Sequence, residues 1–252
     1  MYKIKDYPQI QNNFYLTSRN VGASKKLLGK VNIVTVFLKR SASCWSSSIK
    51  NKYFSAIDKA SDFLMKEAKR YGVSLNIAIY NLETNVPATA DPLDGYDIVK
   101  DYFHRDTVEE LQDYYEEKMG VDEVPIILAF NESGRSFAYR QKFKDKYEVQ
   151  ELSILFYHDK TNHAQAWKTI AHELLHQFGA SDYYFPQEVE KIAKKYFTDS
   201  IMGIGKPVVD DFTAYIIGWK DTISANTYWF LKETMWMNEK EFKKALDDAW
   251  NM

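Results

Sequence analysis

The stretch AHELLHQFGASD, residues 171–182, decides more about this chain than any other segment. On an α-helix, residues four apart share one face, so His172 and His176 can direct both imidazoles at one metal ion. Glu173 lies one position further round the helix, where its carboxylate can take a proton from a water molecule at that ion. The stretch therefore predicts a helix that carries a zinc site suited to hydrolysis.

The residues around these histidines predict a helix with two distinct sides. A period of 3.6 places His172 and His176 opposite an apolar stripe with i, i+3, i+4 spacing. The stripe consists of Trp167, Ile170, Ala171, Leu174 and Phe178. We expect the stripe to face a core and the histidines to face a cleft; the alternative is a surface helix with two polar histidines and a solvated glutamate.

Gly179 and Asp182 supply the rest of a predicted metal site. A glycine just past a periodic segment commonly ends a helix in a left-handed conformation, which lets the chain reverse sharply. Asp182 can then return toward the metal as a third ligand, leaving a fourth position open for water, as a catalytic zinc requires. The alternative for Asp182 is an ordinary turn or cap carboxylate.

Residues 172–182, HELLHQFGASD, resemble the HExxHxxGxxD motif of the metzincin zinc peptidases, in which aspartate replaces the third histidine of better-known members. Residues 199–203, DSIMG, resemble the methionine-containing turn that these enzymes place beneath the metal. The resemblance implies that Met202 forms an apolar floor under the three ligands. Several metzincin groups carry a tyrosine two residues after that methionine, whereas this chain has Ile204.

No tyrosine can be assigned by motif, but Tyr183, Tyr184 and Tyr215 are near enough in sequence to offer a phenol to a developing oxyanion. Of these three we name Tyr215 as the candidate. For substrate binding, an extended peptide could pair with an exposed edge strand. We expect this strand at residues 135–143, which mix apolar residues with Arg135, Tyr139 and Arg140.

Together these features predict a zinc-dependent endopeptidase that holds one Zn²⁺ per chain. Zinc bound by His172, His176 and Asp182 would lower the pKa of its water and polarise the scissile carbonyl, with Glu173 as general base. Two alternatives stay open: a zinc-binding pseudoenzyme, and a narrow-specificity, toxin-like effector protease or other metal hydrolase. Glu188 and Glu190 are rival third ligands of a thermolysin-like plan, and we expect both to be solvated.

Bulk composition limits the partners that we expect. The 252 residues are 45% hydrophobic, enough for a substantial core in one large domain or two joined lobes. A net charge of -2 gives no global field that would recruit nucleic acid or an anionic membrane. We therefore expect a monomer whose partner is a peptide or protein substrate. Cys44 is the only cysteine, so an internal disulfide is excluded, and we expect it to be buried.

Targeting signals are not evident in the sequence. Residues 1–16, MYKIKDYPQIQNNFYL, contain no apolar stretch long enough for a signal peptide, and no run approaches a membrane span. The chain as written therefore predicts a cytoplasmic protein, or a secreted one if it was trimmed from a longer precursor.

The element order predicts an α+β fold like that of the metzincin-like zincins, with a twisted, mixed five-stranded sheet, an active-site helix at the cleft and a smaller helical C-terminal lobe. We expect a single catalytic domain over residues 1–252, made of an N-terminal extension (1–30), an upper lobe with the zinc helix (31–179) and the smaller lobe (180–252). Strands are expected at residues 31–38, 74–80, 124–130, 135–143 and 152–158. Helices are expected near residues 49–71, 106–119, 186–197 and 209–219, with more toward the C-terminus, and a loop over 81–104.

Overall fold

The computed structural model describes residues 1–21, 23–40, 45–87, 89–91, 95–139, 151–164, 166–184, 186–238, 240–241 and 244. Cys44, Arg140 and most of the C-terminal segment EFKKALDDAW therefore lie outside the described residues. The chain forms two compact units, Gly22–Phe178 and Met1–Val21 with Gly179–Met252, and each is described by itself.

The first unit is built on the mixed five-stranded sheet that the sequence predicts. Its strands lie in the order β2-β1-β3-β5-β4, with parallel neighbours except for β4, which is antiparallel to β5. Their bounds are β1 Gly29–Lys39, β2 Leu75–Asn85, β3 Ile126–Ser133, β4 Phe137–Tyr139 and β5 Leu152–His158. β1, β3 and β5 are apolar and largely buried on both faces, as central parallel strands should be.

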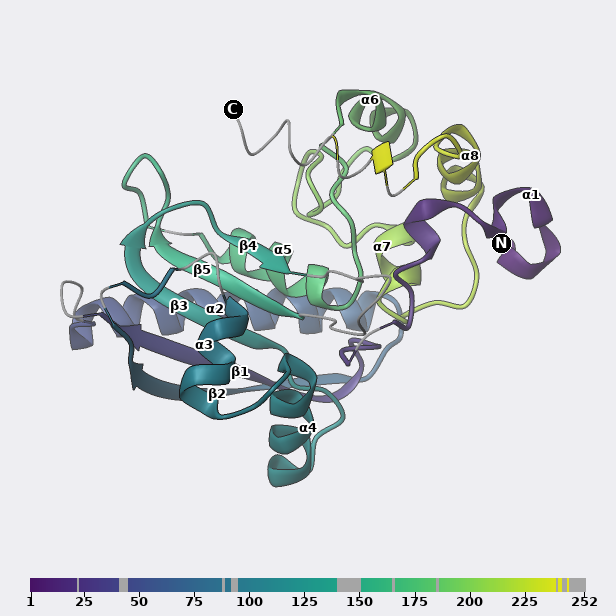
Figure 1. The fold of residues 1–252 in the computed structure, drawn as a ribbon. Helices are drawn as coiled ribbons and strands as arrows, with labels where there is room; N and C mark the ends of the chain where they lie inside the picture. The colour runs from purple at the N-terminus through teal and green to yellow at the C-terminus, as the bar shows by residue number, and fades with distance from the viewer. Residues whose placement is uncertain are drawn as a thin grey trace. The chain divides into compact units, whose positions relative to one another are not determined.

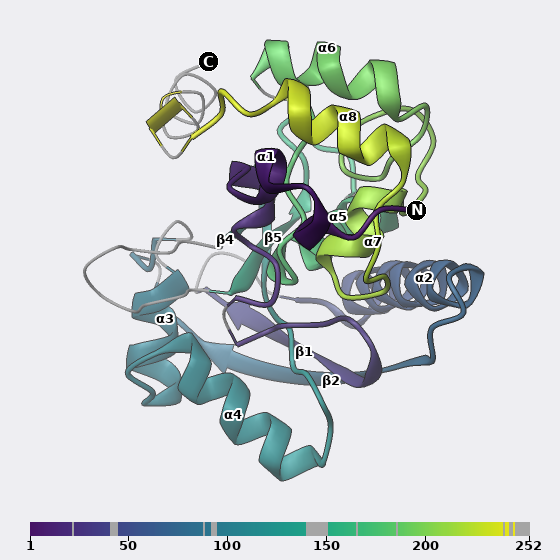
Figure 2. The ribbon, with the colours of Figure 1, turned by 90° about the vertical axis from the view of Figure 1, so that its right-hand side faces the viewer.

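Helices cover both faces of this sheet (Figures 1 and 2). On one face lie α2, Ser47–Arg70, and α5, Trp167–Gln177, where Phe37 of β1 meets the rings of Tyr53 and Phe54. On the other face lie α3, Gly95–Phe103, and α4, Val108–Met119. Here the core cluster of strand and helix residues includes Val34, Val36, Ile98, Val99, Leu111, Leu128 and Ile154.

Two predictions for this unit were wrong in detail. The loop expected over residues 81–104 instead contains the end of β2 and the helix α3. The strand expected at residues 124–130 extends further, because Asn131, Glu132 and Ser133 continue β3 past a register shift. In the strand order, β5 lies between β3 and β4.

The second unit is mainly helical. It contains the 3₁₀ turns η1 Ile4–Asp6 and η2 Phe14–Leu16, and the helices α1 Pro8–Gln11, α6 Gln187–Tyr196, α7 Asp211–Ile216 and α8 Ala225–Glu233. An aromatic core holds it together, with Phe230 5.5 Å from Tyr15, 5.6 Å from Tyr183 and 5.1 Å from Phe197 between ring centroids. The amide of Asn13 donates to the carbonyl of Leu231 at 2.7 Å. The first 21 residues therefore pack within this unit.

Among the residues that the structure describes, no helix combines the length and apolar character that crossing a bilayer requires.

Candidate metal centre

Helix α5 has the two-sided character predicted for it. Ile170, Ala171, Leu174 and Phe178 of the stripe are at most 1% exposed, while Trp167 is partly exposed. The helix ends at Gln177, and Gly179 follows with φ 95°, the positive dihedral expected of a residue that turns the chain away from a helix.

His172, Glu173 and His176 converge at one side of α5. Ligand atoms from the three side chains lie within 4.8 Å of one another, and the Nε2 atoms of the two histidines are 3.0 Å apart. Two nitrogens bound to one tetrahedral zinc at about 2.0–2.1 Å would be roughly 3.3 Å apart, so a small adjustment suffices for both to bind one ion. The imidazole rings are near perpendicular, at 88°, with centroids 4.6 Å apart. The histidines are partly exposed and Glu173 is buried.

A buried polar network anchors this helix to the sheet, and the sequence analysis missed it. The side chain of Gln177 donates to the carbonyl of Ile126 and accepts from its N–H, both at 3.0 Å. It also donates to the Ser153 hydroxyl at 2.7 Å, and that hydroxyl donates to the main-chain carbonyl of Glu173 at 3.2 Å. The available signal was a glutamine beside the apolar stripe, since a buried amide must find hydrogen-bond partners.

Asp182 and Met202 belong to the second unit, where the main chain links their neighbourhoods. The N–H of Tyr183, next to Asp182, donates to the carbonyl of Met202 at 3.0 Å. Met202 is fully buried and Asp182 is 9% exposed. Burial raises the pKa of Tyr15, and the Asp182 carboxylate raises it further. The predicted third ligand and the methionine turn are therefore tied together within one unit.

The methionine turn has a backbone that requires glycine after the methionine. Gly203 has φ 128°, and a Cβ there would lie 2.6 Å from Cδ1 of Tyr184. Before the methionine, the Ser200 hydroxyl accepts from the N–H of Met202 at 3.1 Å and donates to the Asp210 carboxylate at 2.6 Å. The turn is thus specified by the residues on both sides of Met202.

Asp210 connects this turn to α7. Its carboxylate accepts from the N–H groups of Phe212 and Thr213 at 2.9 and 3.0 Å, which caps the helix. It also accepts from the Thr213 hydroxyl at 2.6 Å and from the Tyr183 phenol at 3.4 Å. One buried carboxylate therefore binds the methionine turn, the chain beside Asp182 and the start of a helix.

Tyr215, the candidate oxyanion stabiliser, is engaged by Arg19. The guanidinium lies 3.9 Å from the centre of the Tyr215 ring, and its NH1 donates to the phenol oxygen at 3.2 Å. Burial raises the pKa of Tyr215, while Arg19 lowers it. The phenol therefore stays protonated at neutral pH and keeps a proton to donate. Its role as the oxyanion stabiliser stays a prediction.

The strand predicted for substrate binding is β4, and the two rival metal ligands lie on α6. β4 is an edge strand of the sheet as expected, although the described strand begins at Phe137 and thus after Arg135. Tyr139 ends the strand, in register with Leu152 of β5. Glu190 of α6 forms an ion pair with Lys194 at 2.7 Å, and Glu188 is exposed, in keeping with the solvated role expected for both.

Comparisons with known proteins show a distant likeness among the solved structures. No family model and no curated protein matches the chain. Among solved structures, the chain is similar to metalloproteinase-II from Bacteroides fragilis, with 12% identity and a TM-score of 0.42. The match covers 85% of this chain and 60% of that one, so this chain spans less than two thirds of that protein's length. A likeness this distant does not establish a shared activity, and the proposals below rest on the residues themselves.

Proposed function

We propose that the protein is a zinc-dependent endopeptidase of the metzincin-like type, with His172, His176 and Asp182 as metal ligands and Glu173 as general base. The observation that carries the proposal is the convergence of His172, Glu173 and His176, whose ligand atoms lie within 4.8 Å of one another. Two imidazoles one helical turn apart, together with the Asp182 carboxylate, would form a donor set that suits zinc better than the harder cations calcium and magnesium.

The histidines fit a shared ion in position and in chemistry. Each Nε2 must present a lone pair to the ion, and the 3.0 Å between the two Nε2 atoms is close to the separation of two nitrogens on one tetrahedral zinc. A bound zinc would supply Lewis acidity to the reaction and make a water molecule acidic at neutral pH. Gln177 and Ser153 hold the main chain of α5 on the sheet, and so hold the two rings in position.

Glu173 would act as the proton carrier of the reaction. Its side chain is 6% exposed, so its carboxylate works in a site with little competing water. A carboxylate there takes a proton from the attacking water and returns it to the leaving amine of the cleaved peptide bond. A site used only for structure would have no need of a base at this position.

Asp182 would complete the ligand set, with Met202 beneath it. The support for this part is the turn at Gly179, the burial of both side chains and the hydrogen bond from Tyr183 to Met202. A carboxylate in place of a third imidazole puts additional negative charge on the metal, which would make it a slightly weaker Lewis acid.

The substrate would be a polypeptide in extended conformation. β4 is a sheet edge that contacts α5, and a main-chain edge next to the catalytic helix can align a peptide by strand pairing. Arg135, Tyr139 and Arg140 are the residues that we propose for this contact.

Metal analysis combined with peptide hydrolysis tests the proposal. We expect about one zinc per chain, as one cluster of ligands predicts. We also expect cleavage of an unstructured protein that a chelator abolishes and added zinc restores. A protein that binds zinc but cleaves nothing in a broad peptide library would be a pseudoenzyme or a narrow effector protease. A protein that binds no zinc would overturn the proposal.

A further inference from the structure

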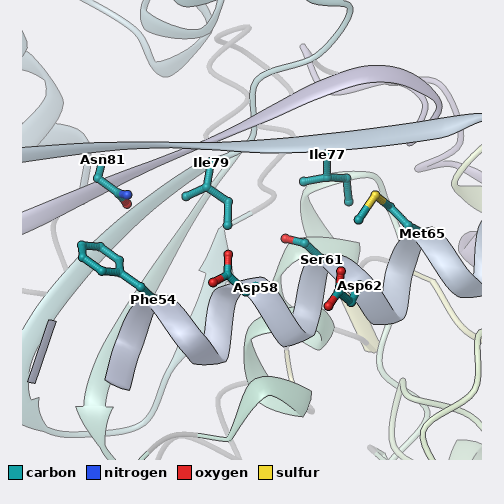
Figure 3. Close-up of a pocket in the computed structure, with 8 residues that line it drawn as sticks. All are labelled: Phe54, Asp58, Ser61, Asp62, Met65, Ile77, Ile79 and Asn81. Carbon is teal, nitrogen blue, oxygen red and sulfur yellow. The ribbon is translucent and has the colours of Figure 1, made fainter. Parts of the chain in front are cut away.

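A hollow between α2 and the edge strand β2 lies apart from α5 and has no role in the proposed hydrolysis. It has a volume of about 700 Å³ and is lined by Phe54, Asp58, Ser61, Asp62, Met65, Ile77, Ile79 and Asn81. Figure 3 shows Asp58 and Ser61 rising from α2 toward β2, with Ile77 and Ile79 pointing back toward the helix. The hollow thus combines an apolar floor with acidic groups.

Ser61 is the first sign that this hollow accepts a ligand. The residue is 3% exposed, and its hydroxyl has no hydrogen-bond partner within the described part of the chain. A buried hydroxyl without a partner costs on the order of 1–3 kcal/mol, and a ligand that forms a hydrogen bond with it removes that cost. In Figure 3 its oxygen points into the hollow.

The two aspartates give the hollow negative charge. Asp58 and Asp62 lie four residues apart on α2, a spacing at which like charges destabilise a helix by a few tenths of a kcal/mol. Neither forms an ion pair with any residue that the structure describes. Glu83, further along the same face of β2, is by contrast paired with both Lys39 and Lys50. The hollow therefore selects for a cationic ligand.

β2 offers a main chain to which such a ligand can pair. The strand is 11 residues long and lies at one end of the sheet, so one of its edges has no neighbouring strand among the described residues. The N–H of Gly29 donates to the carbonyl of Ser74. In a parallel ladder this means that the main-chain N–H and C=O groups of the even-numbered residues of β2 point toward β1. The N–H and C=O groups of Ile77, Ile79 and Asn81 then point to the open edge.

The spacing of Asp58 and Asp62 along α2 is close to the spacing of alternate residues in an extended chain. Residues four apart on a helix are about 6 Å apart along its axis, and alternate residues of a strand are about 6.6 Å apart. Basic side chains at alternate positions of an added strand therefore have the spacing of Asp58 and Asp62. A compact cation would satisfy the charges but not the edge of β2.

We propose that the edge of β2 and this hollow form a docking site for an extended polypeptide segment with lysine or arginine at alternate positions. The segment adds a sixth strand beside β2, its basic side chains reach Asp58 and Asp62, and its methylene groups cover Ile77 and Ile79. The Ser61 hydroxyl forms a hydrogen bond with it. This site is independent of the proposed peptidase activity.

Binding of defined peptides to the full chain tests the proposal. The probe is a fluorescent seven-residue peptide that alternates valine and lysine, and the control peptide alternates valine and glutamate. All proteins carry Glu173→Gln so that the probe is not consumed. We expect the lysine peptide to bind at least about tenfold more tightly than the glutamate peptide, a difference of about 1.4 kcal/mol. N-methylation of one alternate set of amides should abolish binding, and methylation of the other set should not.

Variants of the protein separate this site from general charge attraction. Asp58→Asn with Asp62→Asn should weaken the lysine peptide about tenfold or more without loss of melting temperature, because the change removes a repulsion. Asp113→Asn, an exposed aspartate of α4, is the matched control and should change nothing. Ser61→Ala should weaken binding severalfold while leaving the fold as stable or more so.

Several results would overturn the proposal. They are equal binding of the two peptides, insensitivity to the paired aspartate change, or tolerance of both methylation patterns. A concentration-dependent dimer lost on substitution of Asp58 and Asp62 would instead assign the edge of β2 to a second copy of the chain.

Discussion

Glu173 is the least exposed of the three residues in the candidate metal centre, at 6%, while His172 and His176 are partly exposed. We expect Glu173→Gln to keep zinc and melting temperature but to lower peptide hydrolysis about a hundredfold to ten-thousandfold, the usual cost of a lost proton-transfer group. His172→Ala should lose metal and activity together. Zinc content, melting temperature and hydrolysis are measured on the same preparations, and wild-type hydrolysis by Glu173→Gln would remove its role as base.

Asp182 allows a second test at the scale of single residues. Asp182→Ala should weaken zinc binding markedly, since a carboxylate ligand is lost. Glu190→Ala is the matched control, because Glu190 pairs with Lys194 on α6 and should leave zinc affinity near normal. Zinc affinity is measured by competition with a chelator, and the reverse ranking of the two variants would exclude Asp182 as the third ligand.

Sequence alone predicted the convergence of the histidines with Glu173, because that arrangement depends only on helical spacing. It could not predict Gln177, whose partners Ile126 and Ser153 are 51 and 24 residues distant. A local pattern reports which side of a helix is apolar, but not which main-chain groups lie opposite a polar residue on that side.

At the scale of elements, the attachment of α5 to the sheet can be tested through Gln177. Gln177→Ala would leave the main chain of Ile126 and the Ser153 hydroxyl without their partner, at a cost of roughly 1–3 kcal/mol. Gln187→Ala, at an exposed glutamine of α6, should change stability by less than about 0.5 kcal/mol. Denaturant unfolding measures both, and equal stabilities would mean that the network does not anchor the helix.

The first half of β2 was predicted from its apolar residues, and the second half was missed. The second half of β2 contains Asn81, Glu83 and Asn85, which are exposed at the sheet edge and carry no strand signature. Its conformation comes from pairing with β1 along the whole strand. The strand order likewise depends on long-range pairing, which is why β5 rather than β3 borders β4.

At the scale of the whole molecule, stability should respond to pH through Glu123. Its carboxylate accepts the N–H groups of Lys25 and Lys26 at 3.1 Å, and burial raises the pKa of Glu123 from 4.5 to about 7. Between these values the folded protein keeps a proton that the unfolded chain has lost, so stability falls as pH rises through this window.

Glu123→Gln should remove this dependence, since its side chain is neutral at every pH. The melting temperature of the wild type should therefore fall relative to Glu123→Gln from about pH 5 to about pH 8. Glu117→Gln, at an exposed glutamate of α4, is the control and should follow the wild type. A constant difference between wild type and Glu123→Gln across this range would contradict the prediction.

The sequence could not predict that the first 21 residues pack with the C-terminal part of the chain. Tyr2 forms a bridge with Ile223, and Asn13 binds Leu231, a separation of 218 residues. The polar composition of the first residues gave no sign of these contacts. Contacts between residues so far apart in the sequence produce no local hydrophobic pattern from which they could be predicted.

The bonds of Asp210 have a consequence for how the second unit opens. The Asp210 carboxylate accepts hydrogen bonds from Ser200, Thr213 and Tyr183. If any one of these three segments separates, the buried carboxylate loses a hydrogen-bond donor, so we expect the three segments to open together. The amide hydrogens of Tyr183, Met202 and Thr213 should therefore exchange with solvent deuterium at one common free energy of opening. Asp210→Asn should lower that value for all of them together, which would mark the methionine turn and the chain beside Asp182 as a single cooperative folding unit.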